Sequence, residues 1–170
     1  IFVSMIPPVA NNFVAGETPA QALEHARQLN GRSVGAILNL LGEHYDEREA
    51  ADQDAAAYVS LVEDIGATDL QACVSVKPSQ IGLDVGESVF RENAERIAET
   101  GAEAGVFVWL DMEDHTTVDA TLDVFEALAT AHDGGVGVCL QANLRRTPDD
   151  IERLAALPGK VRLVKGAYDP

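Results

Sequence analysis

Short apolar runs alternate with longer amphipathic stretches along the chain, and this alternation constrains the fold more than any other feature. The apolar runs are NNFVAGE (11–17), VGAILNLLGE (34–43), LQACVSVKP (70–78), VFVWLDMED (106–114), VGVCLQAN (136–143) and VRLVKGAY (161–168). Helix starts are indicated between them at Thr18-Pro19 and Thr147-Pro148, because a hydroxyl can cap a helix that begins with proline. Such alternation predicts a parallel sheet, either doubly wound or closed into a (β/α)8 barrel.

The alternation of side chains within the runs favours the barrel. In residues 106–113 the even positions are aliphatic or Met, whereas the odd positions carry Phe107, Trp109, Asp111 and Glu113. Residues 72–77 and 136–141 repeat the pattern, with one aliphatic face and one face that becomes polar at the carboxyl end. A doubly wound sheet would be aliphatic on both faces, whereas a barrel has a ligand-binding mouth at the carboxyl ends of its strands.

The fold class expected is therefore α/β, a (β/α)8 TIM-type barrel that is incomplete in this chain. About six strands can be read, whereas a barrel needs eight strands and typically ~250 residues. We expect residues 1–170 to form a single partial barrel domain that lacks its carboxyl-terminal part. Because open sheet edges are unfavourable in an isolated protein, either the chain continues beyond Pro170 or another chain supplies the rest.

The charge of the chain limits its partners. It has 28 acidic and 12 basic residues and a net charge of −16, which disfavours nucleic acid and anionic headgroups as partners. A halophilic cytoplasm is the simplest explanation for so many carboxylates over an ordinary apolar pattern. Cys73 and Cys139 lie inside apolar runs, which indicates buried thiols in a reducing compartment. No apolar stretch reaches the roughly 18 residues of a membrane span.

Charged and polar side chains are expected to converge at the carboxyl ends of the strands. Charged groups inside a dry lumen cost several kcal/mol each unless they are paired or bind a ligand. Two interpretations stay open, an ion network that fills the barrel and an active site at its mouth. Lys165 falls on the opposite face. The residues that the alternation places inward are Asn39, Glu43, Lys77, Asp111, Glu113, Gln141, Arg162, Val164, Gly166 and Tyr168.

Six segments, taken in order, resemble a known family. FVAGET, LLGE, SVKPSQIGL, LDMED, LQANLRRT and VRLVKGAYD are similar to segments of the proline dehydrogenase family, over a region from about Asn12 to the end. The resemblance implies a flavoenzyme barrel that oxidises L-proline to 1-pyrroline-5-carboxylate by hydride transfer to N5 of FAD, with a membrane quinone as electron acceptor. One departure is Asn143, where the family would have an aromatic residue.

The resemblance also implies roles for individual residues. The catalytic set would be Lys77, which attracts the proline carboxylate, Asp111, which holds Lys77 and the other cations, Arg162, which lies beside the flavin N5, and Tyr168, which forms a wall of the proline pocket. The flavin would be bound by Gln141, Arg162, Val164, Lys165, Gly166 and Ala167. No metal is implied. The location would be cytoplasmic, and the full-length protein could contact the inner face of the membrane or form a homo-oligomer.

The family grips its substrate with an arginine pair on a late helix, and this chain has no counterpart of that pair. We therefore expect the 170 residues alone to bind FAD poorly and not to turn over proline. Three rival interpretations remain. They are a class I aldolase with a Schiff base on Lys165, an assembly fragment whose edges pair with another chain, and a metal-dependent hydrolase that would use Glu43, His44, Asp111, Glu113 and His115.

Overall fold

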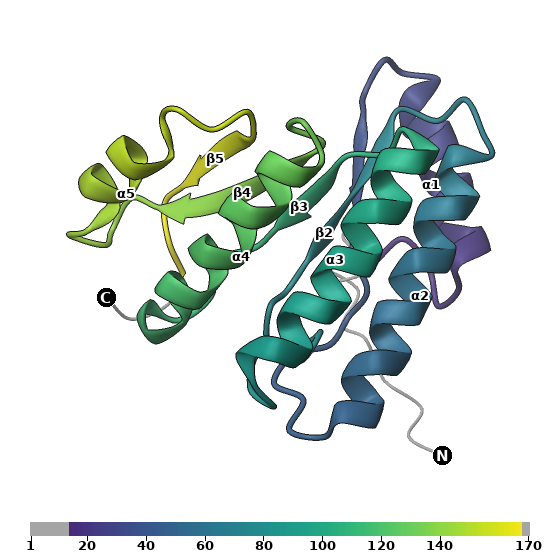
Figure 1. Ribbon diagram of the computed structural model, residues 1–170. Helices are drawn as coiled ribbons and strands as arrows, with labels where there is room; N and C mark the ends of the chain where they lie inside the picture. Colours follow the sequence, from purple (N-terminus) through teal and green to yellow (C-terminus); the bar gives the residue numbers. More distant parts are fainter. Residues whose placement is uncertain (1–13, 168–170) are drawn as a thin grey trace.

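The computed structural model describes residues 14–167, which form a five-stranded parallel sheet and its connecting helices (Figure 1). The strands are β1 (Ala36–Leu38), β2 (Ala72–Val76), β3 (Val108–Leu110), β4 (Val136–Gln141) and β5 (Lys160–Val164), and they neighbour one another in that order. The helices are α1 (Pro19–Asn30), α2 (Arg48–Gly66), α3 (Glu87–Ala104), α4 (Val118–Ala131) and α5 (Thr147–Leu154), with a short 3₁₀ helix η2 (His115–Thr117) before α4.

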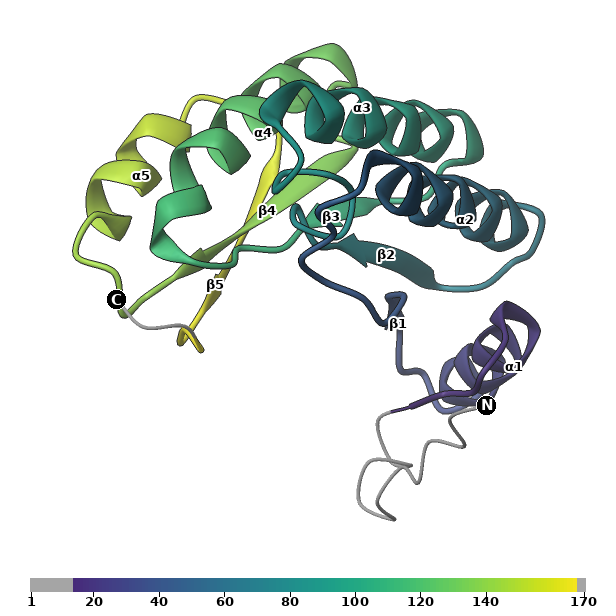
Figure 2. The same cartoon turned by 90° about the horizontal axis from the view of Figure 1, so that it is seen from below.

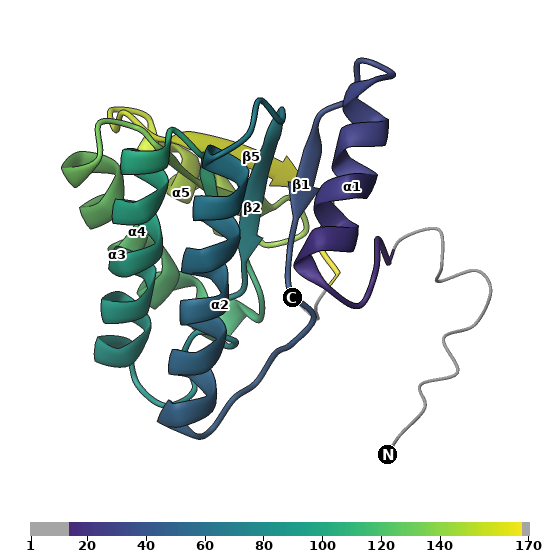
Figure 3. The same cartoon turned by 90° about the vertical axis from the view of Figure 1, so that its right-hand side faces the viewer.

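The helices cover one face of a curved sheet, which makes the fold half of a barrel. Figure 2 shows α2 to α5 along one side of the strands, and Figure 3 shows α1 beside β1 at the sheet edge. The even-numbered aliphatic residues face this helix layer and are buried, as Val74, Val108, Leu110 and Val138 illustrate at 0 or 1% exposure. The expected α/β class is confirmed, as five parallel strands of a partial TIM-type barrel.

Five of the six expected strands are present, and the first apolar run behaves differently. Residues 14–17 of that run carry no strand, and residues 11–13 lie outside the described part of the chain. The strands are also shorter than the runs that predicted them, since β1 covers only Ala36–Leu38 of 34–43. An apolar run sets which residues can be buried, whereas the extent of a strand depends on how far its neighbour continues to pair with it.

One expected helix cap is confirmed and the other is wrong. The side chain of Thr18 accepts a hydrogen bond from the amide of Gln21, and Pro19 begins α1. Thr147, in contrast, is the first residue of α5 rather than its cap, and its hydroxyl donates to the backbone carbonyl of Gln141. That bond links the start of α5 to the end of β4, so the hydroxyl does not cap the backbone N–H groups of α5.

Both edge strands expose apolar side chains. Leu163 of β5 is 57% exposed and Ile37 of β1 is 49% exposed, whereas β4 is buried throughout. Within residues 14–167, β1 pairs only with β2, and β5 pairs only with β4. None of the helices in this part of the chain combines the length and apolar character that a bilayer crossing requires.

Candidate active site

Arg162 of β5 is the centre of a polar cluster, to which β2, the end of β3, and β4 each contribute one side chain. Its Nη2 atom lies 2.7 Å from Oδ1 of Asp111 and 3.1 Å from Oγ of Ser75, and its Nε donates to Sγ of Cys139 at 2.9 Å. Ser75 donates to the same Asp111 oxygen at 2.6 Å. The register explains the cluster, because Cys139 is the direct neighbour of Arg162 in the β4–β5 ladder. The alternation rule therefore placed these side chains on the correct face of the sheet.

Two cation–aromatic contacts lie side by side on the same face of the sheet, and their residues are two positions apart in each strand. Cζ of Arg162 is 4.9 Å from the ring centre of Trp109, and Nζ of Lys160 is 4.6 Å from that of Phe107. The two aromatic rings are 4.9 Å apart and tilted by 58°. Gly137 lies between the strands concerned, since it pairs with Trp109 on one side and with Lys160 on the other.

Lys77 follows β2 and lies at the same end of the sheet as Asp111. Its ammonium group is 2.9 Å from a carboxylate oxygen of Glu43, and its side chain is 24% exposed. The hydrogen bond and charge of Lys77 hold the pKa of Glu43 below its usual value. Asp111 forms its ion pair with Arg162.

Glu113 and Gln141 were both expected to point into the lumen. Both side chains are buried, and both form hydrogen bonds to segments that follow strands. The Glu113 carboxylate, 1% exposed, accepts hydrogen bonds from the amide and the hydroxyl of Ser79 at 2.8 and 2.7 Å. Glu113 lies beyond Leu110, the last residue of β3, and its carboxylate is held by Ser79 in the loop after β2. Gln141 donates to the Glu113 carbonyl at 2.6 Å and accepts from the Ala167 amide at 3.2 Å.

The segment that follows β5 lies against the loop after β4. The backbone carbonyl of Lys165 accepts a hydrogen bond from the backbone N–H of Asn143 at 3.1 Å. Gly166 has a φ of +108°, a conformation that favours glycine. A Cβ at Gly166 would also collide with the side-chain amide of Asn143. Val164, Lys165 and Ala167 are exposed. Tyr168, the last of the expected catalytic residues, lies outside the described residues.

Within residues 14–167, no three His, Cys, Asp or Glu side chains are grouped so that they could hold a metal ion. The histidines named for the metal-dependent alternative pair with carboxylates. Nδ1 of His44 is 2.8 Å from Asp84, and this hydrogen bond raises the pKa of His44. Nδ1 of His115 is 3.4 Å from Asp114.

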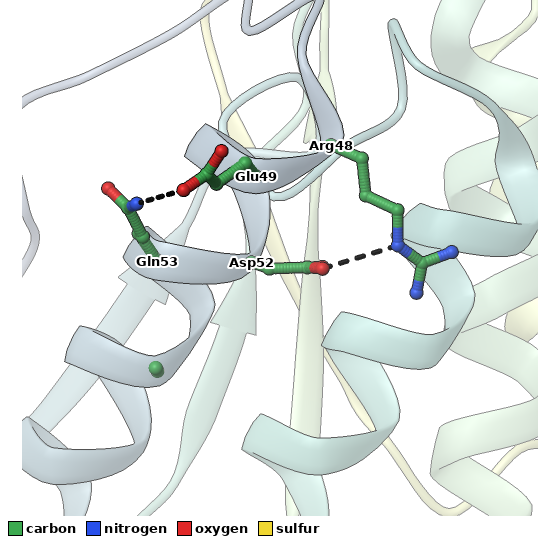
Figure 4. A pocket seen from close by; sticks show the side chains of 5 residues that line it. Arg48, Glu49, Asp52 and Gln53 are labelled. Atoms are coloured by element: carbon green, nitrogen blue, oxygen red, sulfur yellow. Dashed lines mark hydrogen bonds and ion pairs between the residues drawn. The ribbon is translucent and has the colours of Figure 1, made fainter.

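A hollow on the first turns of α2 is not a second candidate site. Its lining residues are Arg48, Glu49, Asp52, Gln53 and Ala56. Figure 4 shows that their polar groups bond to one another, Arg48 to Asp52 at 3.2 Å and Gln53 to Glu49 at 3.4 Å. Because these groups satisfy each other on an exposed helix, the hollow offers a ligand no fixed polar contact.

Four residues of the site were not singled out from the sequence, namely Ser75, Ser79, Trp109 and Cys139. Alternation puts Ser75, Trp109 and Cys139 on the inward face, but nothing in their spacing shows that they contact Arg162. Ser79 lies in a loop, where no periodicity applies. To find them from the sequence, one would need to know the register in which neighbouring strands pair.

Comparisons with known proteins agree on one family. The family model described as proline dehydrogenase matches residues 22–169. A proline dehydrogenase of Deinococcus radiodurans is 37% identical over 164 residues, and proline dehydrogenase 2 of Bacillus subtilis is 31% identical over 159. Each match covers 94% of this chain and 53% or 52% of the relative, so the chain spans about half the length of these relatives.

Solved structures give the same result at the level of the fold. Proline utilization A from Bdellovibrio bacteriovorus, inactivated by N-propargylglycine, superposes with a TM-score of 0.78 at 25% identity, over 91% of this chain and 20% of that one. A proline utilization A with proline bound in remote sites gives a TM-score of 0.71 at 26% identity, over 90% and 18% of the two chains.

Proposed function

The chain belongs to the proline dehydrogenase family, and we propose from this that it contributes the inner wall of an FAD-dependent active site that oxidises L-proline to 1-pyrroline-5-carboxylate. Quinone is the proposed electron acceptor. Because the chain spans about half of its relatives, the activity of the whole protein is part of the proposal, as is the assignment of residues 1–170 to one partial barrel domain. The acidic surface supports a high-salt cytoplasm as its location.

The single observation that carries the proposal is the fixed guanidinium of Arg162. Asp111, Ser75 and Cys139 hold it on the protein side, while 28% of its side chain stays exposed. A cation held in advance of the reaction stabilises negative charge without reorganisation. When bound, FAD supplies the hydride acceptor, and its reduced ring carries the negative charge that Arg162 would stabilise.

The segment after β5 fits a flat ring. Val164 is 37% exposed, and Gly166 has no side chain that would keep a ligand away from the backbone. We assign Val164, Lys165, Gly166 and Ala167 to the lining of the flavin. Gln141 belongs to the same set, although its amide already bonds to Glu113 and Ala167, so its contact to the flavin would use its second amide proton or replace the Ala167 bond.

Lys77 and Glu43 suit a substrate that is both an anion and an ammonium ion. The Lys77 ammonium group would attract the proline carboxylate, and it can exchange its partly exposed partner Glu43, whose side chain is 53% exposed, for that ligand. Asp111 would keep Arg162 in place and balance its charge. The role of Tyr168 as a wall of the proline pocket rests on the family alone.

The test is proline:dye oxidoreductase activity of the natural gene product that contains these residues. We expect a yellow protein that forms 1-pyrroline-5-carboxylate. Arg162→Met should lower kcat/KM by about a hundredfold or more, because it removes a preorganised charge. Arg91→Met, which removes the same charge from the exposed surface of α3, is the matched control. A gene product that holds no flavin and leaves proline unchanged would overturn the proposal.

A second arm uses the 170-residue chain by itself. With only five strands of the barrel described, we expect weak FAD binding and no turnover. Robust proline oxidation by this chain alone would show that the open sheet is a complete active site.

A further inference from the structure

Cys139 links Arg162 to Asp111 through its sulfur atom. The sulfur accepts from Nε of Arg162 at 2.9 Å, and the thiol lies 3.5 Å from Oδ1 of Asp111, to which it can donate. Arg162 and Asp111 also contact each other directly at 2.7 Å. The three side chains therefore form a closed ring of contacts, in which the thiol binds Nε of the guanidinium and the carboxylate binds Nη2.

The thiol can make both contacts only while it is protonated. Cys139 is 4% exposed, and its burial, together with the charge of Asp111, raises the pKa of the thiol to about 11. At neutral pH the sulfur thus keeps its proton for Asp111 and a lone pair for Arg162. This protonation state suits a structural hydrogen-bond partner rather than a nucleophile.

Trp109 contacts the same guanidinium, whose Cζ lies over the indole ring at 4.9 Å from the ring centre. Gly137 of β4 pairs with Trp109 on one side and with Lys160, two residues before Arg162, on the other, and its lack of a side chain lets the indole lie over β4 toward Arg162. A Cβ at Gly137 would lie 2.5 Å from Cζ3 and 2.6 Å from Cε3 of Trp109, so any side chain there would displace the ring. Arg162 is consequently contacted by Cys139 at Nε and by Trp109 at Cζ.

We propose that Cys139 and Trp109 are positioning residues that fix the guanidinium of Arg162, and that Gly137 provides the space for the indole. The inference rests on the proposed function in one respect, since Arg162 is taken to act on the flavin. A guanidinium on a flexible side chain stabilises the charge that develops in the reaction less well if it must first be ordered, because that ordering costs free energy. The orientation of Arg162 can nevertheless be measured without flavin, because its contacts lie within this chain.

The first measurement is the Nε–H resonance of Arg162 in ¹⁵N-labelled 170-residue chain, assigned by its loss in Arg162→Lys. Cys139→Ala should move this resonance and raise the exchange of its proton with water about tenfold, because the hydrogen-bond acceptor is lost. Cys139→Ser should restore slow exchange, because its hydroxyl also accepts. Trp109→Leu should remove the ring-current shift and leave the exchange rate near that of the wild type.

Val138→Ala is the matched control, because it removes volume from the same strand on the helix-facing side. It should lower the stability of the chain without moving the Arg162 resonance. If Cys139→Ala does not fold, Cys139→Ser and Trp109→Leu still test the proposal. An Arg162 resonance that is unchanged in folded Cys139→Ala and in Trp109→Leu would overturn it.

The second measurement uses the flavin-loaded natural gene product. Cys139→Ala should lower kcat about ten- to a hundredfold with little change in KM, as expected for the loss of one hydrogen bond to a charged group, and Cys139→Ser should recover most of it. A wild-type protein that binds no flavin would contradict the proposed function. The Arg162 resonance would still decide whether Cys139 and Trp109 position the guanidinium. A normal kcat in Cys139→Ala would overturn the positioning role while the proposed function stands.

Discussion

Glu113 shows at the scale of one residue how this chain places a carboxylate in its interior. Both carboxylate oxygens accept from Ser79, and the Glu113 carbonyl accepts from Gln141. The residue thereby joins the loop after β2, which begins with Lys77, to the end of β4. A buried carboxylate is tolerated where its hydrogen bonds are made, so Glu113 acts as a brace between two elements of the candidate site.

Replacing Glu113 tests this brace. Glu113→Ala should lower the free energy of unfolding by about 2–4 kcal/mol, because it leaves the amide and hydroxyl of Ser79 buried without their acceptor. Urea denaturation followed by circular dichroism gives the change. Glu103→Ala, on the exposed surface of α3, should stay within about 0.5 kcal/mol of the wild type. Equal losses in the two variants would mean that the Ser79 contacts contribute nothing.

Individual residues of the site were predictable within the strands and at the residue directly after a strand, as Asp111 after β3 shows. Arg162 and Asp111 could be assigned to one face from alternation alone, and their ion pair confirms that assignment. Glu113 could not, because its orientation is set by a loop contact to Ser79. Trp109 was visible as an inward aromatic, but its contact to Arg162 depends on Gly137, whose role appears only when three strands are aligned.

At the scale of elements, β5 is the exposed counterpart of the buried β4. All six residues of β4 are buried, whereas four of the five residues of β5 are exposed. Leu163 is 57% exposed and Val161 42%, and Ile151 of the adjacent α5 is 42% exposed. An unpaired strand edge next to an apolar surface favours association with other chains.

A charged residue in β5 should reduce this association. For the 170-residue chain, Leu163→Lys is expected to lower the fluorescence of the apolar dye ANS about twofold and to shift light scattering toward the monomer. Ala127→Lys adds the same charge to the exposed side of α4 and serves as the control for charge alone. If both variants behave like the wild type, the β5 surface is not the site of association.

The elements themselves were more predictable than their ends. Apolar runs and amphipathic stretches located β1 to β5 in their correct order, because burial against a helix layer leaves a pattern in the sequence. Thr147 could not be told apart from a helix cap, since its hydroxyl finds the Gln141 carbonyl only after β4 and α5 are packed together. The run at 11–17 carries the same apolar signal and, in its described part, forms no strand.

At the scale of the whole molecule, the excess of acidic residues opposes folding. With 28 acidic and 12 basic residues, most carboxylates have no cation to pair with, and their repulsion grows as the chain becomes compact. Ion pairs between helices oppose this only in part. Arg153, for example, bridges Asp123 and Glu126 of α4 from α5, but partly exposed pairs each contribute about 0–1 kcal/mol.

Salt should therefore stabilise this protein. Raising KCl from low concentration to about 1 M shortens the Debye length from ~10 Å or more to ~3 Å. This screens the repulsion of the whole surface and weakens the ion pairs, each of which contributes little. We expect the unfolding midpoint to rise by about 5 °C or more. A midpoint that falls with KCl would mean that the ion pairs outweigh the repulsion, and the proposed high-salt cytoplasm would then lack support.

A charge-reduced variant separates screening from other effects of salt. Glu63 and Asp64 are exposed in the last turn of α2, which contains no basic residue, so they repel both the remaining carboxylates and the negative end of the helix dipole. The double variant Glu63→Gln, Asp64→Asn should be more stable than the wild type at low salt and should gain less from KCl. If the two proteins gain equally, salt acts through the burial of apolar surface rather than through charge, because only the charge differs between them.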